Sequence, residues 1–358
     1  GSIPASLWKA FMDAALAGEP VLNFPPAAHI GASPTPSASA TPSPTPTPTP
    51  TVVPTPDSTP TLTEPPEPLG QAIEVQEGFG CRDARSRAVS FDRPYGWPGD
   101  GQFLAYEFPL VFWLESKGYG VAYATDIDLH EGNDALDKRR VFISSGHDEY
   151  YSDAMRDALE NALSNGTSLA FFGGNDMYRR ARFEDGPYGR DRVEVNYKDA
   201  GEDPLIRADK LATTGQWRDW PIREPEQQLL GAQYECNPVQ ARWVPSFQPG
   251  WLFDSTGFTP GDSVPKLVGY EYDRASDAVA GAPPVTLLAR SPVRCHGRQS
   301  ESDSTFYVAP SGAGVFDAGT IWWNCGLGPG NCKGARPDER VQRLVANLLR
   351  AMFSQKFG

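Results

Sequence analysis

The stretch "VFISSGHDEYYSDAMRDALE", residues 141–160, joins a short strand to a helix through a turn of reactive side chains. Residues 141–143 favour a strand, and Ser152 is a good N-cap for a helix that ends near Gly166. Between the two elements lie His147, Asp148, Glu149 and Tyr150. Turns of this kind hold the sites of open α/β sheets, at the carboxyl ends of the strands.

The surrounding sequence alternates between strand and helix patterns, which is typical of a parallel sheet. We expect the fold class to be α/β, with a mostly parallel sheet flanked by helices and an irregular β-rich insertion over residues 180–300. Residues 304–323 predict a strand pair, and residues 338–353 a closing amphipathic helix. The expected early elements are strands at 88–95, 119–129, 139–146 and 168–175, and helices at 101–118 (with Pro109 inside) and 152–166.

Each of the four early strands is followed by polar or reactive residues. The carboxyl ends of parallel strands meet at one edge of a sheet, so we expect these residues to converge. They are Asp92, Arg93 and Tyr95; Tyr123, Thr125, Asp126 and Asp128; His147 and Glu149; and Asn175, Asp176 and Tyr178. The sequence predicts a site at that edge.

Composition divides the 358 residues into unequal parts. Residues 32–66 are almost all Pro, Thr, Ser and Ala, a composition that favours extended chain and cannot bury a core. We therefore expect a short helical segment at 1–26, a disordered linker at 27–68 and one domain at 69–358. The formal charge of −13 disfavours nucleic acid as a partner, and no apolar run approaches the length of a transmembrane helix.

The five cysteines include no CxxC pair, so a zinc site is not expected. Cys325 and Cys332 flank a glycine-rich loop that would let them form a disulfide. A Ser/Thr/Pro stalk often accompanies an extracytoplasmic location, where disulfides persist. The sequence predicts a secreted or cell-wall-tethered protein; the alternative is five buried thiols in a cytosolic one.

A family resemblance rests on motifs that run in order over roughly residues 85–355. They include "VSFDRPYG", "VFISSGHDEYYSDAMRDALE", "LAFFGGNDMYRRARFE", "GYEYD" and "SDSTFYVAPSGAGVFDAGTIWW". This part resembles the C-terminal domain of the N,N-dimethylformamidase large (beta) subunit family. The resemblance implies a three-layer sandwich like that of class I glutamine amidotransferases and flavodoxin. It also implies hydrolysis of a small amide at a mononuclear ferric iron (Fe3+) held by two tyrosines and one glutamate.

Carried over to this chain, the resemblance implies Glu149, Tyr95 and Tyr123 as iron ligands, with Tyr106 as the substitute if Tyr95 is not one. It further implies four polar site residues, namely His147, Asn175, Lys198 and Glu271. Ferric iron is a hard cation that prefers anionic oxygen ligands, and two phenolates with one carboxylate balance its charge. Trp322 or Trp323 is expected to supply an aromatic wall.

Structural alternatives exist for each of these residues. The tyrosines could be core residues, Glu149 could favour the next helix through its dipole, and His147 could be satisfied by backbone. Lys198 and Glu271 could form a surface ion pair. No cysteine lies at the turn after residues 139–146, so a thiol glutaminase mechanism is not expected.

The expected function is iron-dependent hydrolysis of a small non-peptide amide, the substrate's carbonyl being polarised by the metal. The first rival is a non-catalytic module that binds cell-wall glycan or peptide through Trp217, Trp220, Trp243 and Trp251. The second is a sugar-processing relative of the amidotransferase fold. Residues 3–26 resemble the C-terminal tail of bifunctional penicillin-binding proteins but carry no catalytic motif of that family.

Overall fold

The computed structural model describes residues 86–93, 102–132, 135–330 and 332–358. All of these residues belong to the unit that runs from Glu67 to Gly358. The expected helical segment at 1–26, the linker at 27–68, the start of the expected domain and Tyr95 lie outside the described residues.

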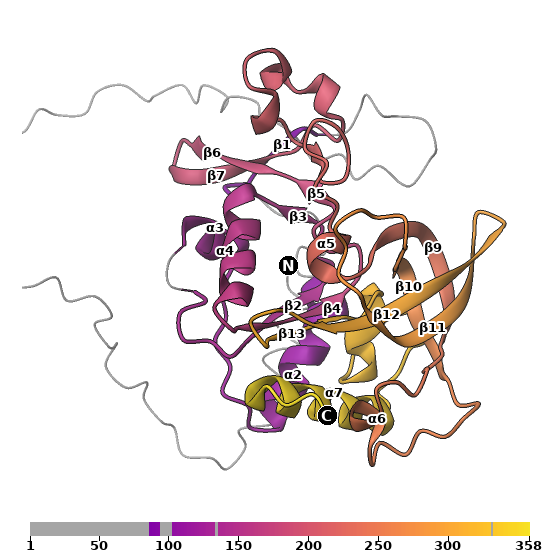
Figure 1. Cartoon of the computed structure of the whole chain (residues 1–358). Helices are drawn as coiled ribbons and strands as arrows, with labels where there is room; N and C mark the ends of the chain where they lie inside the picture. The colour runs from indigo at the N-terminus through magenta and orange to yellow at the C-terminus, as the bar shows by residue number, and fades with distance from the viewer. Residues whose placement is uncertain (1–85, 94–101, 133–134, 331) are drawn as a thin grey trace, which may run out of the picture. The chain divides into compact units, whose positions relative to one another are not determined.

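A five-stranded mixed sheet forms the centre of the described domain (Figure 1), in the order β11-β12-β13-β4-β2. Strands β13, β4 and β2 run parallel, whereas β11 and β12 are joined antiparallel to them. The strands are β2 (Val141–Gly146), β4 (Ser168–Gly173), β11 (Thr286–Cys295), β12 (Arg298–Val308) and β13 (Gly314–Asp317). The expected strands at 139–146 and 168–175 and the expected strand pair at 304–323 are confirmed, and the likeness to glutamine amidotransferases stays a prediction.

Helices cover both faces of this sheet, so every residue of β4 is buried. Successive side chains of β4 point alternately into two separate cores, one on each face. Leu169 and Phe171 pack with α4 (Asp153–Ser164), while Ala170 and Phe172 face α2 (Phe108–Ser116) and α7 (Glu339–Ser354). Figure 1 shows α2 and α7 together on one side of the sheet. The expected apolar face of the last helix is fully buried there: Val341, Leu344, Val345, Leu348, Leu349 and Met352.

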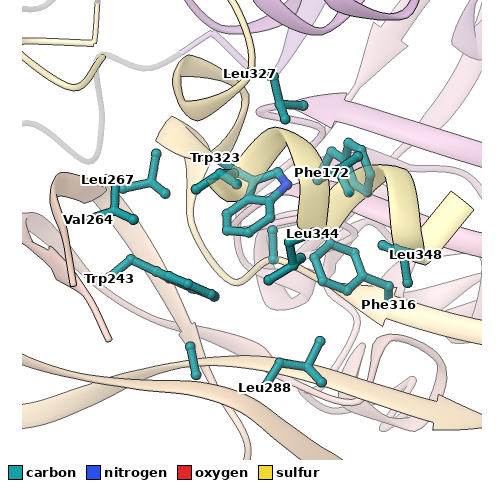
Figure 2. Packing of buried hydrophobic residues seen from close by; sticks show 14 of the residues in the cluster. Phe172, Trp243, Val264, Leu267, Leu288, Phe316, Trp323, Leu327, Leu344 and Leu348 are labelled. Carbon is teal, nitrogen blue, oxygen red and sulfur yellow. The ribbon is translucent and has the colours of Figure 1, made fainter. Parts of the chain in front are cut away.

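The core beside α7 combines aromatic rings with aliphatic side chains, as Figure 2 shows around Trp323. The Trp323 ring lies 5.4 Å from that of Trp243 and 5.7 Å from that of Phe316, measured between centroids. Trp323 belongs to the 3-10 helix η6 (Ile321–Gly326), and Trp243 to β9 (Gln233–Trp243). This core therefore joins the β-rich insertion to the central sheet.

Local signals account for the helix boundaries on either side of the opening motif. The Ser152 hydroxyl accepts a hydrogen bond from the Met155 amide, as expected of an N-cap. Pro109 lies in the first turn of α2, where its missing N–H costs nothing, and a π-helical turn, η2 (Phe103–Glu107), precedes it. The regular α-helix therefore begins late within the expected segment at 101–118.

Two of the four expected early strands were wrong in type or place. Residues 119–125 form no strand, and α3 (Asp126–Glu131) follows because Thr125 and Asp128 form a reciprocal capping box. Strand β1 (Ala88–Ser90) does form, but it pairs antiparallel with β7 in a separate sheet. Only the ends of β2 and β4 therefore meet as predicted.

Three small sheets and several short helices lie outside the central sheet, and most of their residues belong to the insertion. The strands are β3 (Tyr150–Tyr151), β5 (Arg179–Arg180), β6 (Arg182–Gly186), β7 (Gly189–Val195), β8 (Gly215–Gln216), β9 and β10 (Val264–Arg274). The helices are η3 (Ala200–Glu202), η4 (Pro204–Arg207), η5 (Lys210–Ala212), α5 (Gln227–Leu230) and α6 (Gly250–Phe253).

Two disulfides join Cys236 to Cys295 and Cys325 to Cys332. The second confirms the expected bridge across the glycine-rich loop, and Cys81 lies outside the described residues. Among the described helices, none combines the length and apolar character that a membrane span requires.

Candidate active site

The residues of the opening motif meet two other segments at the carboxyl edge of the central sheet. Strands β2 and β4 are paired in parallel up to Gly146 and Gly173, so the residues that follow them lie side by side. His147 and Glu149 follow β2, and Asn175 follows β4. Glu271 comes from β10 of the insertion, which reaches the same edge.

Glu271 is the centre of a buried polar cluster. Its Oε1 accepts a hydrogen bond of 2.5 Å from the Asn237 side-chain amide, and its Oε2 accepts one of 2.5 Å from Asn175. The Nε2 atom of His147 lies 3.4 Å from Glu271 Oε2 and 3.3 Å from Asn175 Nδ2. The two amides hold Glu271 in place, and Glu271 faces the imidazole.

Burial of His147 lowers its pKa, but the hydrogen bond to Glu271 and the negative charges of Glu271, Glu149 and Asp148 outweigh burial. The net effect is a raised pKa for His147. Its Nε2 also lies 3.6 Å from Glu149 Oε2. The imidazole between two carboxylates is suited to hold and release a proton.

Aromatic residues from two elements border the imidazole. The Tyr270 ring stands edge-on to His147, with 6.2 Å between ring centroids. Tyr106, on η2, lies against Gly146: a Cβ added to that glycine would lie 3.3 Å from the Tyr106 Cβ. Burial raises the pKa of Tyr106, and the negative charge of Glu271 acts in the same direction. Gly146 has a φ of +84°, so the turn and the close approach both favour glycine here.

Cationic groups line the other side of Glu149. The Arg179 Nε donates to Glu149 Oε1 at 3.2 Å, and an Arg179 terminal nitrogen donates to the Lys198 carbonyl at 3.1 Å. The Lys198 ammonium donates to the Tyr150 hydroxyl and lies 4.2 Å from the centroid of the Tyr150 ring. Lys198 thus belongs to the periphery of the site and does not pair with Glu271 at the surface.

The structure brings His147, Glu149, Asn175 and Glu271 together but leaves Tyr123 elsewhere. The Tyr123 side chain is 61% exposed, and its hydroxyl donates to Glu115 at 2.7 Å. Partial desolvation and the Glu115 carboxylate raise the pKa of Tyr123 to about 12, opposite to the direction that a phenolate ligand needs. Tyr95 lies outside the described residues.

The described residues fit the expected iron only in part. Glu149 is in the cluster, but its oxygens face Arg179 and His147, and Tyr123 does not join it. In the described part of the chain, one set of His, Cys, Asp or Glu atoms converges closely enough for a metal: Cys236, Cys295 and His296. Two of these three form a disulfide, so this set offers no ready metal site.

Two residues of the site were missed in the sequence. Asn237 lies in "CNPV" beside a cysteine, and a half-buried amide on the insertion has no short-range signal. Arg179 lies within the family-like "MYRRARFE" stretch, yet only folding shows that it faces Glu149. Both depend on contacts between segments far apart in the chain.

Three of the four tryptophans expected to bind sugars are not available for that role. Trp217 and Trp243 are buried, and Trp251 packs against Phe306 and Phe357. The described tryptophan that is exposed is Trp220. Trp322 and Trp323 are also buried, so neither presents an open wall to a ligand.

A surface cavity of about 570 Å³ lies between α3, α4 and the end of α7, and one of about 450 Å³ beside Tyr119 and Phe353. Neither contains a residue of the His147 cluster. We place the candidate site at the cluster because acid–base groups and the side-chain amides of Asn175 and Asn237 converge there, which neither cavity offers.

Comparison with known proteins gives the same family that the motifs indicate. The family described as N,N-dimethylformamidase beta subunit-like, C-terminal, matches residues 70–336. The N,N-dimethylformamidase beta subunit of Paracoccus aminophilus is 26% identical over 293 residues, covering 69% of this chain and 36% of that protein. The beta subunit from Alcaligenes sp is 24% identical over 293 residues, with the same coverage of 69% and 36%. The chain thus spans about a third of the length of these relatives, and it belongs to the N,N-dimethylformamidase beta subunit-like, C-terminal family.

Proposed function

We propose that this domain hydrolyses the C–N bond of a small non-peptide amide, with His147 as its acid–base group. The observation that carries the proposal is the buried cluster in which Glu271, fixed by Asn175 and Asn237, faces the His147 imidazole. The family supports it, since the curated relatives are N,N-dimethylformamidase subunits.

Each group of the cluster has a role in this reaction. His147 takes the proton of the attacking water and gives it to the nitrogen of the departing amine. Glu271 stabilises the imidazolium that forms between these steps, and the Asn175 and Asn237 amides keep Glu271 oriented. Arg179 and the Lys198–Tyr150 pair lie on the far side of Glu149, where they offer donors to a polar substrate.

We further propose that the hydrolysis depends on iron. Its support is the family resemblance and the position of Glu149 within the cluster. Of the described tyrosines that the resemblance implies as ligands, Tyr106, the substitute, lies beside the cluster, and Tyr123 does not. Because the described residues supply the expected ligand set only in part, we assign no step of the reaction to the metal.

The proposal also includes an amidotransferase-like fold class and a location outside the cytoplasm. A sheet covered by helices on both faces is compatible with the amidotransferase-like three-layer class. Two disulfides in one domain suit an oxidising compartment, so we propose an exported protein that acts outside the cytoplasm.

The test is amine release from simple formamides and acetamides by the full chain, before and after loading with iron. We expect turnover, a loss of at least about 100-fold in kcat for His147→Ala, and no change for Arg343→Met on the exposed face of α7. Absence of turnover by iron-loaded protein would contradict the hydrolase proposal. Bound iron with a tyrosinate ligand would give a visible absorption band, which Tyr106→Phe should shift and Tyr123→Phe should leave unchanged.

The rival function, a glycan- or peptide-binding module, is weakened by the burial of Trp217 and Trp243. It predicts saturable binding of cell-wall fragments without turnover, and loss of that binding in Trp220→Ala. That result would favour the binding module over the enzyme.

A further inference from the structure

Three buried aspartates lie behind the acid–base cluster. Asp176, Asp273 and Asp317 follow or end β4, β10 and β13, and each is at most 1% exposed. In each carboxyl group, one oxygen accepts a backbone N–H: Asp176 from Asp148 at 3.2 Å, Asp273 from Asn175 at 2.8 Å, and Asp317 from Gly319 at 2.8 Å. The second oxygen of each is buried without a hydrogen-bond partner.

Among the described residues, no Lys, Arg or His side chain forms a salt bridge with any of these three carboxyl groups. Arg218 is bound to Glu226, and Arg290 is bound to Asp303. The oxygens of the three aspartates do not converge closely enough to share a metal ion among the described residues. A buried carboxylate without a counter-charge is costly, so burial favours the protonated form of each of these groups.

Asp273 is the member of the three that reaches the candidate site. Its Oδ1 holds the backbone N–H of Asn175, whose φ of +60° lies in the left-handed region. This conformation turns the Asn175 amide toward Glu271 at 2.5 Å and His147 at 3.3 Å. A left-handed conformation of a residue other than glycine persists where its surroundings hold it.

We propose that Asp273 is a positioning residue, whose carboxylate holds the Asn175 backbone and thereby fixes the Asn175 amide between Glu271 and His147. This inference rests on the proposed function, because it concerns how the acid–base pair of that same site is held. An ionised acceptor binds an N–H more strongly than a neutral one, so deprotonation of Asp273 tightens this contact.

The surroundings of Asp273 make its charge sensitive to pH near neutrality. Burial raises the pKa of Asp273 to about 7, against the N–H of Asn175, which lowers it. The titratable and charged groups that face it from the neighbouring elements are Asp176, Asp317, Glu226, Glu271, Arg218 and Tyr234. Burial also raises the pKa values of Asp176 and Asp317 well above the usual range.

Because the pKa of Asp273 is higher in the folded than in the unfolded chain, stability falls with pH. The unfolded chain loses this proton first, near pH 3.8, and the folded chain loses it near pH 7. The destabilisation grows between these values and is complete above them. Asp273→Asn keeps an oxygen for the Asn175 N–H and removes the charge.

The experiment follows the backbone amide signal of Asn175, the group that donates to Asp273, by NMR from pH 5 to 9, with urea denaturation from pH 4 to 9. In the unaltered protein we expect this signal to shift with a midpoint near 7, and in Asp273→Asn we expect it to retain at most a shift that follows the titration of the His147 ring signals. We also expect the unfolding constant of Asp273→Asn to be at least tenfold smaller than that of the unaltered protein at pH 8, and equal to it at pH 4. The matched control is Asp317→Asn, which removes a similarly buried acid that does not contact Asn175.

Asp317→Asn should change stability and still show a titration of the Asn175 signal, because it leaves the Asp273 carboxyl group in place. A constant Asn175 signal in the unaltered protein, or the same titration in Asp273→Asn, would overturn the inference. If Asp273→Asn does not fold, the presence or absence of the Asn175 titration in the unaltered protein still tests the inference. These readouts require no substrate, so a failure of the hydrolase proposal would show in the amine-release assay alone. If turnover is found, the pH profile of kcat should lose its limb near pH 7 in Asp273→Asn, with KM unchanged.

Discussion

The buried pair of Arg218 and Glu226 allows a prediction whose size follows from the structure. Glu226 is 0% exposed, and the Arg218 guanidinium donates to both of its oxygens. Two guanidinium nitrogens also donate to the Tyr234 carbonyl, each at 2.9 Å. Arg218→Met would keep much of the side-chain volume but leave a buried carboxylate and a carbonyl without their donor.

Removing one partner of a buried ion pair costs about 3–5 kcal/mol, because the remaining charge is buried alone. That is a large fraction of the usual domain stability of about 5–15 kcal/mol. Burial already raises the pKa of Glu226, against the opposing effect of Arg218. Without Arg218 the pKa rises further, so Glu226 binds a proton at acid pH and the variant should lose less stability at pH 5 than at pH 8.

Urea denaturation at the two pH values measures this loss. The matched control is Arg343→Met, whose partner Glu339 is exposed on the surface of α7, and whose cost should be at most about 1 kcal/mol. Adding Glu226→Gln to Arg218→Met should restore part of the stability, because it removes the unpaired charge. A cost for Arg218→Met that equals the control, or that does not change with pH, would refute the reasoning.

Three further perturbations test the core, the disulfides and the edge of the sheet. Trp323→Ala should cost about 3–5 kcal/mol in urea denaturation and Trp323→Phe clearly less; an equal cost would show that the aromatic packing is not what matters. Cys236→Ser should lower the free energy of unfolding by about 4 kcal/mol and Cys325→Ser by about 2 kcal/mol. The difference arises because the two disulfides close loops of different length, with sequence separations of 59 and 7 residues. A lower melting temperature for Cys325→Ser than for Cys236→Ser would contradict this dependence on loop length. Gly174→Ala would place a Cβ 2.8 Å from the Thr320 backbone and should lower both stability and any turnover, whereas Gly250→Ala, with nothing within 4 Å, should change neither.

Local signals were sufficient for the elements that carry the opening motif. The Ser152 N-cap, the apolar face of the last helix and the strand at 139–146 all follow from short-range chemistry. The segment at 119–129 failed because two local signals competed there. Its β-prone start predicted a strand, but the capping box of Thr125 and Asp128 starts a helix within it.

By itself, the sequence determined that His147 and Glu149 follow a buried strand, that Asn175 follows the next one, and which family the domain belongs to. Only the tertiary structure decided that Glu271 and Asn237 come from the insertion to meet them, and that Tyr123 turns away to Glu115. The physical reason is the range of the contacts. Glu271 is separated from Asn175 by 96 positions, and no periodicity or capping rule encodes a hydrogen bond over that distance. The charge of Asp273 likewise depends on burial, which arises only when β4, β10 and β13 pack together.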